Sequence, residues 1–151
     1  MRIFSYLIIF SFTILPINAE SKYTVNQLGE IWGYLYSNTK ILPIIKRKFP
    51  TLVNDVNRLQ KHYDESLLIK PAFIGATKEL KIHFPIEYQQ MGIMKEQMNR
   101  KINLLEKSSS FDLNRAKSTL FEYESMFAGK IKPQYLPIMK SLAKTYYIRP
   151  K

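Results

Sequence analysis

Apolar residues recur along most of this chain at the three- and four-residue spacing of an α-helix. The segment 51–68 is a clear case. Its apolar stripe consists of Leu52, Val56, Leu59, Tyr63 and Leu67. No segment alternates between apolar and polar residues convincingly enough to predict a strand. The pattern therefore predicts an all-α fold, a compact bundle of five or six helices joined by short loops.

Capping residues, prolines and glycines set the expected ends of these helices. The expected helices cover about residues 25–37, 51–68, 86–107, 111–128 and 133–147. Residues 72–84 could form a further helix or, near their end, an extended segment. Residues 41–45 are predicted to form a short apolar turn around Pro43. Pro137 fits the last helix only if it falls in the first turn, where its missing N–H costs no hydrogen bond.

Two features of the pattern predict how the helices pack. Gly29 and Gly33 lie four residues apart on one helix flank, which favours a close crossing with another helix at that point. In the segment 86–107, Ile86, Ile93 and Leu104 form a second apolar stripe well away from the first. We therefore expect this long helix to contact neighbours on two sides and to lie centrally in the bundle.

The first 19 residues follow a different pattern. Arg2 precedes an apolar run of 13 residues, and Pro16 and Ala19 follow before the first acid. This order is typical of a secretory signal peptide. The run is shorter than the ~20 residues that a membrane span needs. We expect cleavage after Ala19, a single helical domain over residues 20–151, and a secreted or periplasmic location.

The composition argues against several kinds of chemistry. The chain has no cysteine, which excludes disulfides, thiol nucleophiles and thiolate metal sites. It has two histidines and none of the common catalytic or phosphate-binding motifs. His83, with Glu79 and Glu87 four residues away on either side, is a weak candidate for a general base. The sequence therefore favours a binding protein over an enzyme.

The charge indicates what such a protein would bind. Lys and Arg number 23 against 12 Asp and Glu, a formal net charge of +11. A basic surface attracts acidic proteins, anionic membranes, acidic envelope polymers and nucleic acid. Export makes nucleic acid a poor candidate for the partner. The main expectation is therefore an acidic partner protein, and an immunity or inhibitor protein is one form of this function. The expected contact residues are Lys46, Arg47, Lys48, Lys140, Lys144, Tyr146, Tyr147 and Arg149.

An alternative function rests on methionines. Met91, Met94 and Met98 fall on one face of the helix 86–107, and His83 lies just before it. Thioethers are ligands that Cu(I) prefers, so the alternative is a periplasmic copper-handling protein. Ile102 continues the same stripe, however, which favours methionines that simply fill the core.

Overall fold

The computed structural model describes residues 21–147, and every regular element in that range is a helix. The elements are α1 (Val25–Lys48), the 3-10 helix η1 (Pro50–Leu52), α2 (Val53–Glu65), α3 (Ile69–His83), α4 (Pro85–Lys107), α5 (Leu113–Phe127) and α6 (Leu136–Tyr146). The all-α prediction is therefore confirmed, and six α-helices fall within the predicted number. The predicted signal peptide, residues 1–19, and the predicted contact residue Arg149 lie outside the described residues. Within residues 21–147, no helix is both long enough and apolar enough to span a membrane.

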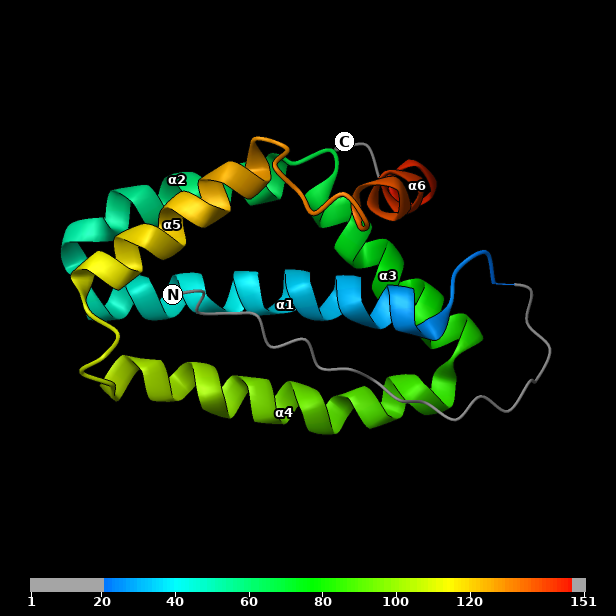
Figure 1. The fold of residues 1–151 in the computed structure, drawn as a ribbon, viewed down its shortest axis with the longest axis horizontal. Helices are drawn as coiled ribbons and strands as arrows, with labels where there is room; N and C mark the ends of the chain where they lie inside the picture. Colours follow the sequence, from blue (N-terminus) through cyan, green and yellow to red (C-terminus); the bar gives the residue numbers. More distant parts are fainter. Residues whose placement is uncertain (1–20, 148–151) are drawn as a thin grey trace.

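The central element of the bundle is α1, which contacts α2, α3 and α4 (Figure 1). Leu28, Ile31, Leu35 and Ile45 of this helix are completely buried. α4 runs alongside α1 in the same direction, so the C-terminal ends of the two helices lie at the same end of the molecule (Figure 1). α5 packs on α2, and α6 packs on α3.

The first helix is longer than the sequence predicts. Thr24 caps its start as expected, with its side chain accepting a hydrogen bond from the Gln27 backbone. The helix does not end near residue 37, however, but continues through Pro43 to Lys48. A proline inside a helix costs about 3 kcal/mol. The buried aliphatic side chains on either side of it, Ile41, Leu42, Ile44 and Ile45, each return about 1.5–3 kcal/mol. Their burial therefore outweighs the lost hydrogen bond.

The two packing predictions are wrong. α4 lies at one edge of the molecule (Figure 1), and its second stripe faces solvent, with Ile86, Ile93 and Leu104 each 65–66% exposed. The close helix crossing is not at the predicted pair of glycines either, because a Cβ added at Gly29 or Gly33 would meet nothing within 4 Å. It lies between α3 and α6, at Gly75.

The turn between α2 and α3 also differs from the prediction. α2 ends at Glu65, and the Ser66 hydroxyl accepts hydrogen bonds from the backbone N–H groups of Leu68 and Ile69, which starts the next helix. Leu67, expected on the inner stripe, is therefore 70% exposed. The ambiguous segment 72–84 is helical as far as His83. Pro137 falls at the start of α6, as required.

Candidate functional site

The last helix presents a basic face to solvent. Met139, Leu142 and Ala143 are buried on its inner side. Lys140, Lys144 and Tyr147 are exposed on the other side. Their spacing of four and three residues places these three side chains on one stripe of the helix and its C-cap.

The inner side of α6 is fitted closely against α3. A Cβ added at Gly75 would come within 2.7 Å of Tyr146 Cδ2 and 3.1 Å of Leu142 Cβ, so only glycine fits without a shift of α6. The Tyr146 hydroxyl donates a hydrogen bond of 2.6 Å to Glu79 Oε1. That bond raises the pKa of Tyr146 to about 12, with burial and the Glu79 charge adding to the effect. Helix α6 is therefore held in one position on α3.

Two lysines from other segments flank the stripe. Lys22 Nζ donates to Ser141 Oγ at 2.8 Å, and the Tyr23 hydroxyl reaches the same oxygen at 2.6 Å. Lys78 of α3 places its ammonium 5.5 Å from the centre of the Tyr146 ring. We call Lys22, Lys78, Lys140, Lys144 and Tyr147 together the α6 basic face. Sequence reasoning missed Lys22 and Lys78, because only the fold brings them to α6.

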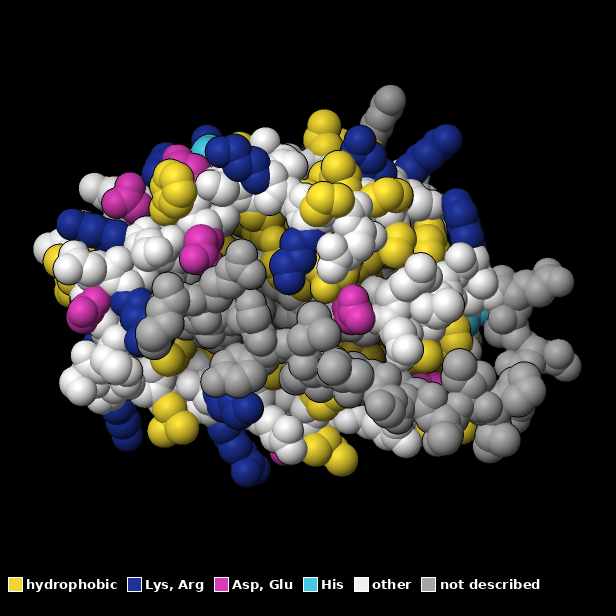
Figure 2. Space-filling model, viewed as in Figure 1, with side chains coloured by type: hydrophobic (Ala, Val, Ile, Leu, Met, Phe, Trp, Pro, Cys, Tyr) yellow, Lys and Arg dark blue, Asp and Glu magenta, His cyan; other side chains and the backbone are white. Residues whose placement is uncertain are grey.

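The α6 basic face is not neutralised by nearby acids. Among the described residues, no ion pair joins any of its four lysines to a carboxylate. The nearest acid in the α3–α6 contact is Glu79, whose side chain is only 12% exposed and lies between Tyr146 and His83. Figure 2 shows dark-blue side chains around α6 at the upper right, whereas most magenta ones lie to the left, toward α2 and α5. The positive charge of this face is therefore available to a partner.

The other predicted basic cluster, Lys46 to Lys48, is engaged within the molecule. Lys46 Nζ donates to Asn57 Oδ1 at 2.9 Å. Arg47 makes a bidentate ion pair with Glu106, in which Nε donates to Oε1 at 2.9 Å and Nη2 to Oε2 at 3.0 Å. Lys48 Nζ donates to the backbone carbonyls of Leu105 and Ser108 at the C-terminal end of α4. We call these three residues the α1 clasp, because they tie the end of α1 to α2 and α4.

The methionines of the copper alternative do share one face of α4, but that face is turned toward the core. Met91 is 4% exposed, and Met98 packs against the core cluster. His83 lies in the last turn of α3, with Nε2 3.5 Å from Glu79 Oε2. Within residues 21–147, no group of three or more His, Asp or Glu side chains is placed to hold a metal ion. Cu(I) binding by the thioethers stays a prediction from the sequence.

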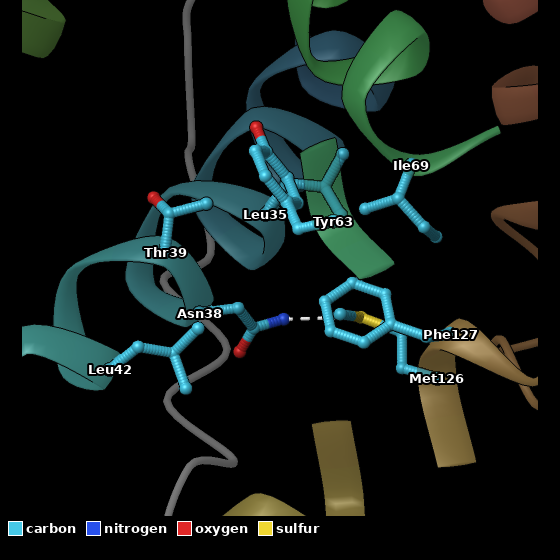
Figure 3. Close-up of a pocket in the computed structure, with 8 residues that line it drawn as sticks. All are labelled: Leu35, Asn38, Thr39, Leu42, Tyr63, Ile69, Met126 and Phe127. Atoms are coloured by element: carbon cyan, nitrogen blue, oxygen red, sulfur yellow. Dashed lines mark hydrogen bonds between the residues drawn. The ribbon is translucent and has the colours of Figure 1, made fainter. Parts of the chain in front are cut away.

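The described residues also form two hollows. Figure 3 shows the first, an apolar cavity of about 10 Å³, in which Asn38 Nδ2 donates to Met126 Sδ at 3.3 Å. That volume is at the lower limit for a single water molecule, so the cavity is a small gap in the packing. Its lining consists of Leu35, Asn38, Thr39, Leu42, Tyr63, Ile69, Met126 and Phe127.

The second hollow, of about 510 Å³, is open to solvent between the ends of α2 and α5. Its two carboxylates are already paired. Glu65 lies 3.8 Å from Lys61, and Glu124 forms an ion pair with Arg58. The hydrogen bond from Arg58 lowers the pKa of Glu124, and the positive charge of Arg58 adds to the effect.

The α6 basic face is thus an exposed group of positive charges on a helix that is fixed against α3. The chain matches no protein-family model, no curated protein and no solved structure.

Proposed function

We propose that this chain is an exported, non-enzymatic binding protein whose α6 basic face engages an acidic partner protein. The observation that carries the proposal is the pair Lys140 and Lys144, which are exposed and unpaired among the described residues on a helix that is firmly seated on α3. Charges already held in place by the fold require little reorganisation when a partner arrives. An acidic surface would be drawn to this face and oriented by it.

Three further features support the proposal. The charge is unevenly distributed along the chain, since no acidic residue follows Glu124, whereas six basic ones do. Tyr147, 39% exposed beside the lysines, supplies a large aromatic ring of the kind enriched at protein interfaces. The pattern of residues 1–19 favours export. An immunity or inhibitor protein acting on an acidic exported toxin or hydrolase is the form of this function that we favour.

The experiment is capture of partners from a cell-envelope extract, followed by titration of the captured protein with purified variants. The test variant is Lys140→Glu with Lys144→Glu. The control is Lys117→Glu with Lys130→Glu, which makes the same change of net charge at two exposed lysines that do not belong to the α6 basic face. We expect the test variant to weaken binding by about tenfold or more, with a flatter dependence on salt, and the control to change it much less.

Two results would count against the proposal. Equal weakening by both variants would mean that net charge alone drives the binding. Unchanged binding by the test variant would place the contact on another part of the surface.

A further inference from the structure

The outer side of α4 carries a straight line of exposed aliphatic side chains. Ile86, Ile93 and Leu104 are each 65–66% exposed. They lie seven and eleven residues apart, which is two and three helical turns, so they share one stripe about 27 Å long. Met91 and Ile102, which attach this helix to the core, lie on its opposite side. The stripe is therefore not needed for the contact with α1 and α3.

Positive charge accompanies this stripe. Arg100 lies between Ile93 and Leu104 on the same side of the helix, and Lys107 follows one turn later. Two acids, Glu87 and Glu96, lie on the flanks of the stripe, and Glu96 Oε2 is 3.9 Å from Arg100 Nη2 in a strongly exposed pair. In Figure 2, yellow and dark-blue side chains project together along the lower edge of the molecule, where α4 runs. The outer side of α4 is thus both apolar and basic.

We propose that the outer side of α4 binds an anionic lipid membrane surface, with the helix lying along it. Exposed aliphatic side chains can enter the boundary between headgroups and acyl chains, while arginine and lysine contact the acidic headgroups. A lipid surface fits because it needs no shaped pockets. The three aliphatic side chains stand apart, with Gln90 and Gln97 between them, so they do not form the continuous apolar core of a stable protein interface.

A second copy of this chain suits the stripe less well. Three separated side chains bury much less apolar area than the ~800 Å² per partner of a standard interface. The copy would also bring another strongly basic molecule against this one, whereas an anionic membrane complements its net charge of +11.

Membrane binding through α4 is separate from the proposed function, because it involves another side of the molecule than the α6 basic face. α4 forms the lower edge in Figure 1 and α6 lies at the upper right, and α6 packs on α3. A chain attached through α4 would still present its α6 basic face to a partner. The two surfaces can therefore be tested separately.

The test is sedimentation with vesicles of phosphatidylcholine alone or of phosphatidylcholine mixed with phosphatidylglycerol. The protein is produced from the full sequence, and mass spectrometry of its N-terminus ensures that all variants are compared in the same form. The test variant is Ile86→Gln, Ile93→Gln and Leu104→Gln. The control is Leu67→Gln with Phe121→Gln, which removes two equally exposed apolar side chains away from α4.

We expect the unaltered protein to bind the anionic vesicles and not the neutral ones. The test variant should bind the anionic vesicles about tenfold more weakly than the unaltered protein, and Ile93→Gln alone should bind with an affinity between those two. The control should bind as well as the unaltered protein. Circular dichroism should show the same helix content in all of them, because every altered side chain is exposed.

Three outcomes would overturn the proposal. Binding that is unchanged in the test variant would mean that charge alone attracts this protein to lipid. Equal losses in the test and control variants would remove the special role of α4. A dimer of the unaltered protein that the test variant breaks, seen by analytical ultracentrifugation without lipid, would assign the stripe to a second copy of the chain.

Discussion

The α1 clasp and the α6 basic face are built from similar residues, but the surroundings of their charges differ. In the clasp, each cation has an acceptor within hydrogen-bond distance: Asn57 for Lys46, Glu106 for Arg47, and two backbone carbonyls for Lys48. In the α6 basic face, Lys140 and Lys144 have no such acceptor among the described residues. The charges of the α1 clasp are bound within the fold, whereas Lys140 and Lys144 are exposed and unpaired among the described residues.

The position of each cluster relative to helix ends explains part of the difference. α1 and α4 run in the same direction, so the negative ends of two helix dipoles and their unpaired carbonyl groups meet where the clasp lies (Figure 1). Lys48 donates to two carbonyl groups at that end, those of Leu105 and Ser108, whereas Lys46 and Arg47 bind the side chains of Asn57 and Glu106. The comparison teaches that a run of basic residues at the end of a helix is as easily a cap as a binding site.

Replacing Lys48 should have the largest effect on stability. Lys48→Met keeps the length of the side chain but removes both hydrogen bonds to α4 and the contacts of the ammonium with the rings of Phe49 and Phe111, at 5.7 and 5.8 Å. We expect the free energy of unfolding to fall by about 2 kcal/mol. Lys144→Met, the matched change on α6, should alter it by less than about 0.5 kcal/mol. Urea unfolding followed by circular dichroism measures both.

If Lys144→Met proved as destabilising as Lys48→Met, the lysines of α6 would also belong to the fold. The distinction between the two clusters would then fail, and the proposed contact surface would have to be sought elsewhere.

Tyr146, the last residue of α6, and Tyr147, its C-cap, provide a finer comparison. Tyr146→Phe removes the hydrogen bond to Glu79 and should lower the free energy of unfolding by about 1 kcal/mol at neutral pH, whereas Tyr147→Phe should leave it nearly unchanged. The folded-state pKa of Tyr146, about 12, is above the ordinary value of 10. The hydrogen bond of Tyr146 therefore contributes fully to the free energy of unfolding below about pH 10, and this contribution is lost as the pH rises toward 12.

Unfolding measured between pH 8 and 12 checks this prediction. The difference in stability between the unaltered protein and Tyr146→Phe should shrink as the pH rises through that range. A constant difference would mean that the hydroxyl contributes by packing rather than by donating its proton to Glu79.

The local parts of the fold could be predicted from the sequence because they depend on neighbouring residues. The Thr24 cap, the break before Pro85 and the apolar stripe of α6 are all within a few residues of the elements that they specify. The continuation of α1 through Pro43 could not be predicted in this way. It depends on the burial of Ile44 and Ile45 by helices that come later in the chain.

The candidate site could be predicted only in part for the same reason. Lys140 and Lys144 were recognised from their own helix, but Lys22 reaches Ser141 across 119 positions of sequence. Tyr146 is one of the expected contact residues, but no local pattern indicates its hydrogen bond to Glu79, 67 positions away. Likewise, nothing near Arg47 in the sequence indicates that Glu106 lies beside it.

The ion pair between Arg47 and Glu106 gives the smallest predicted effect and the most direct test of the clasp. The hydrogen bond from Arg47 lowers the pKa of Glu106, with the positive charges of Arg47, Lys107 and Lys48 adding to it. Because the folded-state pKa is below the ordinary value, the pair stabilises the protein above that value and ceases to do so as acid protonates the carboxylate. Both side chains are exposed, so salt should weaken the pair further.

Arg47→Gln should raise the pKa of Glu106 toward its ordinary value in an NMR titration, whereas Lys140→Gln should leave that pKa where it is. A Glu106 pKa that responded equally to both changes would show that the general field of this basic protein sets it, and that the α1 clasp and the α6 basic face are not electrostatically distinct.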